Sequence, residues 1–294
     1  WFKSVLDEWG IDEKDSKVVY TDSGRKRFGK RIRKPYDDED YIVEGDRICI
    51  DHHTAHIYSA LSDCSQHAAF DGWGSGRNTG LTVTPDGQKR YKDLSVGKFL
   101  SYVGYAMDFK GMEVDFPGKV MGLQAYGTPD LDLARQINQD NILDLCGEWM
   151  LRGVDSKDSK FQDFVATVHK ACELIQLEHF KVFDSSKKIS CSGGVMLNTV
   201  INTELRKTYD IEIIPHVYDG GLSVGALRYA VGHNFDMGDF PYCQDDYAPE
   251  EAHDDTIEKA AELLAQGKII GWYQGHGEIG PRALGNRSIL MNPM

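Results

Sequence analysis

Hydrophobic and polar positions along this chain alternate between two patterns. Short apolar runs bounded by glycine or charged residues predict strands at 47–50 and 67–72. They also predict a strand that enters a glycine turn in 188–194, and a strand followed by a loop and Asp-Gly-Gly in 210–221. Apolar residues at helical spacing predict helices at 1–10, across most of 95–184 with the longest at 160–183, and at 197–207 and 222–232. Strands that alternate with helices in this way predict an α/β domain.

The remaining segments predict connections and a second domain. Residues 11–45 are polar and charged, which predicts a loop or a weak hairpin, and 81–93 alternates around Pro-Asp-Gly, which predicts a hairpin. A helical pattern that begins at 254 stops at Gly267, and a strand pattern follows it. We therefore expect a first domain over 1–235, a linker over 236–253 and the beginning of a second domain over 254–294.

Composition limits the class of function. The 294 residues are 41% hydrophobic and 27% charged, values close to those of globular proteins. The formal net charge of -13 argues against a nucleic-acid partner, because phosphate backbones are bound by clustered Lys and Arg. The basic stretch at 24–34 lies beside the acidic residues 37–40, and we interpret it as a solvated face.

The cysteine pattern and the length of the apolar runs indicate the cellular compartment of the protein. None of the six cysteines forms a C-x-x-C pair, which favours a reduced, cytosolic setting. No apolar run approaches the ~20 residues that cross a bilayer, and the signal-peptide pattern is absent. We therefore expect a cytoplasmic protein that has no membrane partner, and nothing in the sequence predicts its oligomeric state.

A histidine cluster, DHHTAH at 51–56, is the first candidate for chemistry. On a helix, residues four apart lie on the same face, so His52 and His56 can offer two imidazole nitrogens to one metal ion. His53 points elsewhere, next to the ligands or exposed to solvent. The spacing alone is equally compatible with capping or surface histidines, and a catalytic metal also needs a carboxylate ligand.

Two turns are candidates for binding a nucleotide, and a third presents a carboxylate. Glycines in 71–80 let backbone N–H groups approach a phosphate, although an ordinary hairpin turn has the same composition. A strand delivers Gly193 and Gly194 to the start of a helix, where a nucleotide can lie against the backbone, although a tight turn without a ligand is the alternative. Asp219 precedes a helix before two glycines, and a plain N-cap explains it equally well.

Six segments together resemble the O-carbamoyltransferases of the nodulation and antibiotic-tailoring type. They are DHHTAH, DGWGSG, GKVMGLQAYG (118–127), SGGVMLN (192–198), the Asp219-Gly-Gly turn and GEIGPRALGNRSIL (277–290). The resemblance spans roughly 46–294. It implies a large domain of the actin-like ATPase (ASKHA) fold, similar to the tRNA threonylcarbamoyl transferases, followed by a smaller YrdC-like domain.

The resemblance also implies roles for individual residues. The metal, expected to be Fe²⁺, would be bound by His52, His56 and Asp219. A nucleotide would contact the glycine turns through Asp71, Gly72, Gly74, Gly76, Gly193, Gly194, Asn198 and Gly220. In the small domain, Arg282 and Arg287 would bind carbamoyl phosphate and ATP, although a structural turn with a buried arginine is the alternative. The acceptor pocket or the domain seam would include Lys119, Gln124 and Tyr126.

The activity that this family implies is transfer of a carbamoyl group. Carbamoyl phosphate and ATP would give carbamoyl-adenylate, and the carbamoyl group would pass to a hydroxyl of a small-molecule acceptor. No general base can be identified, and His53 is only a geometric candidate. Two other functions stay open: a tRNA threonylcarbamoyl transferase-like enzyme, which the net charge and the GPRALGNRS motif oppose, and a nucleotide-binding module without catalysis.

The ends of the chain depart from the family pattern. The chain begins at Trp1, and no glycine-rich phosphate turn precedes residue 46. The second domain would have some forty residues, which are too few for an independent core of that type. We therefore expect a fragment that lacks part of the large-domain sheet and most of the adenylation site, and that has little or no activity by itself.

Overall fold

This computed structural model of the protein describes residues 18–21, 39–44, 47–92, 95–107, 111–242 and 254–293. The predicted helix at 1–10, the basic run at 24–34 and the later part of the predicted linker lie outside the described residues. The chain divides into two compact units, 1–233 and 234–294, and each is described by itself.

A small sheet forms the start of the first unit. Its strands are β1 (Val18–Thr21), β2 (Tyr41–Glu44) and β3 (Arg47–Ile50), in the order β1-β3-β2. The predicted strand at 47–50 is confirmed as β3, with a buried Ile50 at its end. Within the predicted loop or weak hairpin over 11–45, the described residues include the two strands β1 and β2, which do not form a hairpin because they do not pair with each other. They flank β3, which is parallel to β1 and antiparallel to β2.

The larger, five-stranded sheet is mixed and has the order β6-β5-β4-β7-β8. Its strands are β4 (Gln66–Phe70), β5 (Gly80–Thr84), β6 (Gly87–Tyr91), β7 (Ile189–Ser192) and β8 (Ile211–Ile213). The predicted strands and the hairpin are confirmed. β4, β7 and β8 are mutually parallel, so their carboxyl ends meet at one edge of the sheet. That edge carries the turns that follow each strand.

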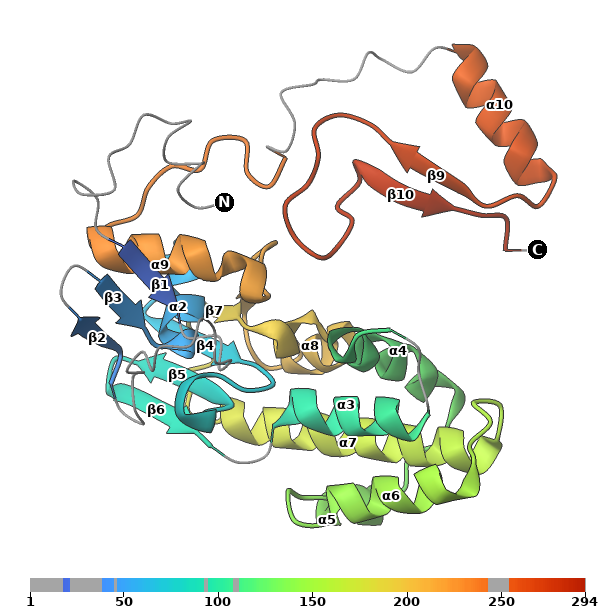
Figure 1. Ribbon diagram of the computed structural model, residues 1–294, viewed down its shortest axis with the longest axis horizontal. Helices are drawn as coiled ribbons and strands as arrows, with labels where there is room; N and C mark the ends of the chain where they lie inside the picture. The colour runs from blue at the N-terminus through green and yellow to red at the C-terminus, as the bar shows by residue number, and fades with distance from the viewer. Residues whose placement is uncertain are drawn as a thin grey trace. The chain divides into compact units, whose positions relative to one another are not determined.

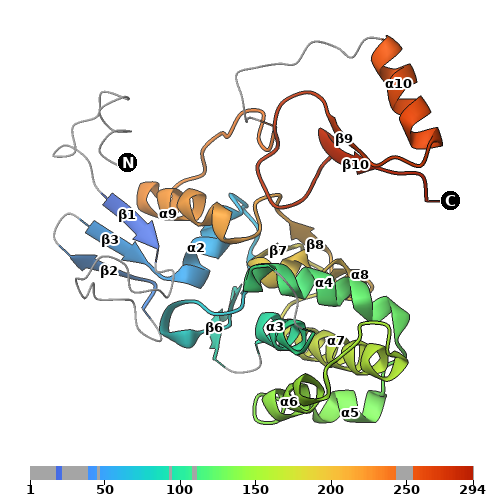
Figure 2. The same ribbon diagram turned by 45° about the vertical axis from the view of Figure 1, so that its right-hand side comes forward.

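Helices cover one side of this sheet and form the main core (Figures 1 and 2). They are α3 (Val96–Ala106), α4 (Phe116–Leu123), α5 (Leu131–Gln136), α6 (Ile142–Arg152), α7 (Ser159–Phe180) and α8 (Thr199–Leu205). The predicted long helix at 160–183 is confirmed as α7, which begins at its N-cap Asp158. Fully buried Phe99, Phe161 and Phe180 anchor this core.

α2 (His52–Ser59) packs between α9 (Leu222–Val231) and the five-stranded sheet. On one side Ala55 packs with Leu222, and on the other Ile57 packs with Ala69. α9 comes so close that a Cβ at Gly225 would lie 1.8 Å from the carbonyl oxygen of Ala55. Only glycine fits this crossing, and the crossing brings the start of α9 next to α2.

The second unit contains α10 (Asp254–Ala265) and an antiparallel pair, β9 (Ile270–Tyr273) and β10 (Arg287–Leu290). The predicted helix and the strand after it are confirmed. Gly267, the predicted stop, has a positive φ of 72°, a conformation that favours glycine. A loop over 274–286 connects β9 to β10 and contains the GPRALGN motif.

Within the described ranges, no helix is both long enough and apolar enough to cross a membrane. Five cysteines in these ranges are free thiols: Cys49, Cys64, Cys146, Cys172 and Cys191.

Candidate metal centre

α2 begins directly at the histidine cluster, as the spacing predicted. His52 is its first residue and His56 lies one turn later, and the two rings have centroids 4.9 Å apart. Both side chains are buried. The structure therefore places two imidazoles side by side on one face of a short helix, away from solvent.

Asp71 meets these imidazoles from the end of β4. Its Oδ2 lies 3.3 Å from His52 Nε2 and 3.1 Å from His56 Nε2. Its Oδ1 accepts a hydrogen bond from Gly72 N at 2.5 Å. Sequence analysis assigned Asp71 to the nucleotide turn and missed it as a candidate metal ligand. The signal in the sequence for a metal ligand here was the position of Asp71, a short polar residue directly after the buried strand β4.

Asp219 completes the group from the turn before α9. Its Oδ1 lies 3.5 Å from His52 Nε2 and 3.4 Å from His56 Nε2. One ligand atom from each of the four side chains lies within 4.8 Å of the other three. The Asp219 side chain is 61% exposed whereas those of His52 and His56 are buried, so the group is open to solvent at Asp219. Asp219 is the first residue of a 3-10 turn (Asp219–Gly221) and the N-cap of α9 is Gly221, so the plain N-cap that was its alternative is wrong.

The carboxylates give the group a strong preference for positive charge. Burial alone would lower the pKa of His52, but hydrogen bonds with Asp219 and Asp71 outweigh it and raise the pKa to about 10. Burial would raise the pKa of Asp71, yet the two imidazoles hold it well below its usual range. Without a metal, a proton on His52 therefore supplies the positive charge that a cation would bring.

The donor set and its surroundings fit a divalent transition metal. Two imidazoles with one or two carboxylates suit Zn²⁺ or Fe²⁺. His56 Nδ1 lies 3.4 Å from Ser192 Oγ, so its other ring nitrogen has a partner and Nε2 is directed to the group. Ligating histidines almost always have such a partner on the second nitrogen.

His53 is buried beside the group but does not belong to it. It is fully buried, so the possibility that it is exposed to solvent is excluded, and both ring nitrogens lack a hydrogen-bond partner. Burial lowers its pKa to about 3, with a contribution from His52. Its ring packs against the loop after β4, where a Cβ at Gly74 would lie 2.6 Å from His53 Cε1. The glycine is therefore needed for packing at this position.

The predicted nucleotide turns gather at the same edge of the sheet. Gly193 N donates to Val217 O at 2.7 Å, and a Cβ at Gly193 would lie 2.2 Å from Phe70 O. Gly193 also has a positive φ of 89°, so two independent constraints require glycine there. A Cβ at Gly194 would lie 3.1 Å from Asp71 Oδ1. The turns after β4, β7 and β8 are therefore in contact beside the candidate metal centre.

The other predicted nucleotide residues have individual roles. Asn198 caps α8 by accepting from Ile201 N at 3.1 Å, and its amide lies 3.0 Å from His169 Nε2, so its side chain is engaged within the protein. Gly76 has a positive φ of 61° in the loop between β4 and β5. Gly220 follows Asp219 and packs against the ring of Tyr218.

The predicted acceptor residues lie elsewhere on the first unit. Lys119 is on α4, and Gln124 and Tyr126 belong to the single 3-10 turn that follows it (Gln124–Tyr126). Tyr126 is 76% exposed. None of the three belongs to the group of four ligands. Their role as an acceptor pocket or a domain seam stays a prediction.

Arg282 and Arg287 lie in the second unit and differ from each other. Arg287 Nε donates to Glu278 Oε2 at 3.0 Å, and Nη2 donates to the carbonyls of Gly280 and Arg282. Glu278 is 1% exposed and also accepts from the backbone N–H groups of Leu284 and Asn286. Arg287 therefore bonds within its own loop, but its side chain is 40% exposed and so is not the buried arginine of the structural alternative. The Arg282 side chain is exposed.

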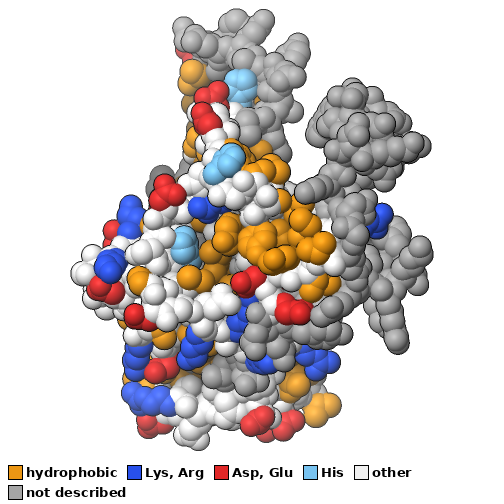
Figure 3. All heavy atoms as spheres, turned by 90° about the vertical axis from the view of Figure 1, so that its left-hand side faces the viewer, with side chains coloured by type: hydrophobic (Ala, Val, Ile, Leu, Met, Phe, Trp, Pro, Cys, Tyr) orange, Lys and Arg blue, Asp and Glu red, His pale blue; other side chains and the backbone are white. Residues whose placement is uncertain are grey.

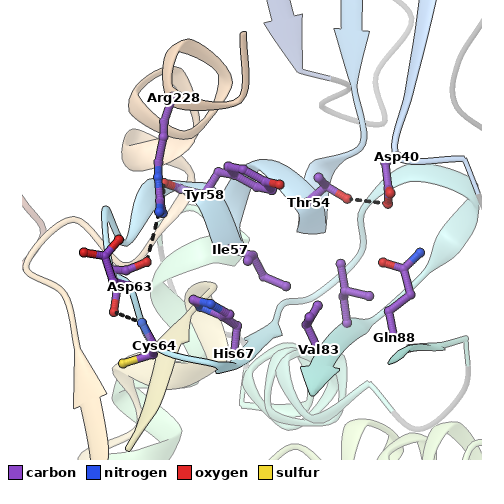
Figure 4. Close-up of a pocket in the computed structure, with 12 residues that line it drawn as sticks. Asp40, Thr54, Ile57, Tyr58, Asp63, Cys64, His67, Val83, Gln88 and Arg228 are labelled. Atoms are coloured by element: carbon purple, nitrogen blue, oxygen red, sulfur yellow. Dashed lines mark hydrogen bonds between the residues drawn. The ribbon is translucent and has the colours of Figure 1, made fainter. Parts of the chain in front are cut away.

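A pocket of about 400 Å³ lies on the other side of α2. In Figure 4, Ile57 of α2 points toward Val83 and His67 of the sheet. Arg228 lines it too but donates to the carbonyl oxygens of Tyr58 and Ser62 at the end of α2. None of the candidate metal ligands or predicted acceptor residues lines this pocket.

The aromatic surface beside the pocket is continuous. The Tyr58 ring lies 4.9 Å from the Tyr229 ring, which lies 5.6 Å from that of Tyr41 on β2. Figure 3 shows hydrophobic side chains gathered on this face.

Comparison with known proteins shows which family the sequence is similar to. Residues 261–294 match the family model described as carbamoyltransferase C-terminus. The nodulation protein NolNO of Sinorhizobium fredii is 30% identical over 300 residues, which cover 83% of this chain and 43% of that protein. The nodulation protein NolO of Bradyrhizobium diazoefficiens is 30% identical over 217 residues, which cover 60% of this chain and 40% of that protein.

These matches confirm the resemblance to the carbamoyltransferase family that the motifs predicted. The chain spans about two fifths of the length of these relatives. Among solved structures, component A of the (R)-2-hydroxyglutaryl-CoA dehydratase of Acidaminococcus fermentans aligns with a TM-score of 0.49 and 15% identity, over 78% of this chain and 81% of that one.

Proposed function

We propose that this chain supplies the metal- and nucleotide-binding site of an O-carbamoyltransferase. Hydrolysis of carbamoyl phosphate would release phosphate and give carbamate, whose oxygen would displace pyrophosphate from the α-phosphorus of ATP to form carbamoyl-adenylate. A hydroxyl of a small-molecule acceptor would then take the carbamoyl group, with AMP as the leaving group. The observation that carries the proposal is the convergence of two imidazoles and two carboxylates from separate segments, within 4.8 Å of one another.

His52, His56, Asp71 and Asp219 would hold the ion, with Fe²⁺ as the expected metal. A bound divalent ion supplies Lewis-acid polarisation of an oxygen of the substrate. The two carboxylates supply the negative charge that retains the ion, and the exposed side of the group at Asp219 leaves access for a ligand. Ser192 orients His56 through the second ring nitrogen.

The glycine turns support the nucleotide part of the proposal. In α/β sheets, ligands bind outside the carboxyl ends of parallel strands, and backbone N–H groups there can bind phosphate. The turns after β4 and β7 lie at this edge, in contact with Asp71. An adenylate there would place its phosphate beside the metal ligands. This arrangement supports an actin-like ATPase type of nucleotide domain for the first unit.

The second unit would contribute to handling carbamoyl phosphate. Its family match covers the loop that carries Arg282 and Arg287. Because the Arg282 side chain is exposed and that of Arg287 bonds Glu278 and two carbonyls of the loop, we assign anion contact to Arg282 and loop support to Arg287. The YrdC-like fold of this unit and its share in adenylate formation are part of the proposal.

Titration with Co²⁺ and then with a non-hydrolysable ATP analogue tests the proposal on this chain. We expect one Co²⁺ per chain, with a visible spectrum typical of nitrogen and oxygen ligands, and tighter binding of the analogue once the ion is present. A chain that binds neither ion nor nucleotide contradicts the proposal.

The transfer itself is measured by mass spectrometry of hydroxylated acceptors incubated with carbamoyl phosphate, ATP and Fe²⁺. The expected product is an acceptor that has gained one carbamoyl group, at low yield for this chain alone. Product that forms at the same rate without ATP would contradict an adenylate route.

A further inference from the structure

Arg90 is buried beside the beginning of α2 but outside the group of four ligands. It lies on β6, and its side chain is 5% exposed. Its Nη1 donates to Asp51 Oδ2 at 2.7 Å, and its Nη2 donates to Asp40 Oδ1 at 2.5 Å. One guanidinium therefore joins two carboxylates, one before β2 and one at the start of α2.

Asp51 connects this arginine to the first turn of α2. It is the N-cap of the helix, and its side chain is 2% exposed. The oxygen that receives Arg90 also accepts from Thr54 N at 2.9 Å. Thr54 Oγ1 lies 3.1 Å from Asp51 Oδ2 and 3.1 Å from Asp40 Oδ1. The helix start, the arginine and the segment before β2 form one bonded network.

The strand register connects Arg90 to the strand that ends at Asp71. Arg90 lies opposite Leu81 of β5, and Leu81 lies opposite Ala69 of β4. Residues directly opposite each other point to the same face of a sheet. Ile57 of α2 packs against Ala69 and Leu81 on that face. Arg90 therefore bonds the helix that carries the imidazoles to the sheet that carries Asp71.

This network is better explained by geometry than by stability. α2 has eight residues, and a helix of that length is marginal by itself. A buried ion pair costs desolvation free energy that offsets much of its attraction, so it is weak evidence for stability. A small movement of the first turn would displace His52 and His56 together, because they lie one turn apart.

We infer that Arg90 is a positioning residue for the metal centre: by holding Asp51 and Asp40 it fixes the first turn of α2 and directs His52 and His56 toward Asp71. The inference rests on the proposed function, because it needs a cation at this site. Arg90 does not contact the ion and acts only through the helix start.

The double variant Arg90→Gln with Asp51→Asn tests the inference. Asparagine caps helices about as well as aspartate. The pair of changes removes one positive and one negative charge, so the local net charge is the same. We expect the wild-type far-UV circular dichroism, a Kd for Co²⁺ raised about 10- to 100-fold, as for other groups that orient metal ligands, and a changed visible spectrum of the bound ion.

Two further variants make the result decisive. Arg135→Gln breaks an exposed ion pair with Asp132 and should bind Co²⁺ like the wild type. Arg90→Lys keeps the charge but reaches one carboxylate, so we expect a smaller loss of affinity, and it decides the question if the double variant does not fold. A folded Arg90 variant with wild-type affinity and spectrum overturns the inference. Absence of Co²⁺ binding in the wild type overturns the metal centre itself, and the inference with it.

Discussion

The metal centre and the loop between β9 and β10 are built in opposite ways. The centre takes its side chains from α2, from the end of β4 and from the turn before α9, which are far apart along the chain. In the loop, the side-chain bonds of Glu278 and Arg287 have their partners within ten residues of the chain. In the loop the arginine is balanced by a buried carboxylate and two carbonyls. In the centre two carboxylates face two imidazoles and favour an added cation.

The difference shows that a charged residue in a motif does not by itself identify a ligand contact. Arg287 belongs to a family motif, yet its donors are used to close the loop. Asp71 belongs to a glycine turn, yet one of its oxygens faces the two imidazoles. In both cases the bonded partners of the side chain determine its role.

Removal of both imidazoles should have the largest effect. The double variant His52→Ala with His56→Ala loses two of four donors, and two carboxylates alone are poor ligands for Co²⁺ or Fe²⁺. We expect the bound Co²⁺ to fall from one ion per chain to none in an equilibrium titration. The variant His233→Ala, also a histidine of the first unit but outside the ligand group, should keep the ion. A double variant that still bound one ion would contradict the ligand assignment, and a wild type without metal would favour a nucleotide-binding module.

Loss of the buried carboxylate in the loop should open that loop only. Glu278→Gln keeps the shape but loses one acceptor oxygen and the charge that Arg287 pairs with. We expect the amides of Leu284 and Asn286 to lose their protection in hydrogen exchange, while the first unit stays protected. Glu262→Gln on the exposed face of α10 serves as the control. If the amides of Leu284 and Asn286 exchanged as slowly in Glu278→Gln as in the wild type, the Glu278–Arg287 pair would not stabilise the loop.

Among the described residues, His179 has no hydrogen bond to a carboxylate, so its pKa should shift in the opposite direction to that of His52. Burial, helped by the charge of Lys89, lowers the pKa of His179 from 6.5 to about 4. The unfolded chain therefore takes up a proton first, so stability is fully present above pH 6.5 and is lost as the pH falls toward about 4. The shift corresponds to about 3 kcal/mol of unfolding free energy.

His179→Phe tests this contribution, because Phe preserves the stacking on Phe70, whose ring centroid lies 5.1 Å away. The free energy of unfolding of the variant, measured by urea denaturation between pH 7 and pH 4, should fall less steeply than that of the wild type. Equal slopes would show that His179 does not titrate as stated.

The sequence predicted the parts of the fold that depend on local pattern. The strand at 47–50, the hairpin after the glycine loop and the long α7 follow directly from apolar spacing. The pairing of β1 and β2 with β3 was missed, because each strand is a four-residue apolar run inside a segment that is otherwise polar and charged. The spacing of His52 and His56 predicted two imidazoles on one helical face, since that depends only on the helix repeat.

The rest of the site depends on contacts that no local pattern contains. The approach of Asp219 follows from the packing of α9 on α2 at Gly225, and only the family resemblance indicated it. Asp71 can act as a metal ligand because Gly72 N donates to its Oδ1, which leaves Oδ2 to face the two imidazoles. His53 is buried because a loop more than twenty residues later packs on it at Gly74.

A crystal structure of the chain grown with Co²⁺, with anomalous diffraction recorded at the cobalt edge, tests the central claim most directly. The account predicts one strong peak bonded to Nε2 of His52 and His56 and to carboxylate oxygens of Asp71 and Asp219, at about 2.0–2.2 Å. An anomalous peak bonded to other residues would contradict it, and so would the absence of any peak in a crystal in which the four ligand side chains are well ordered.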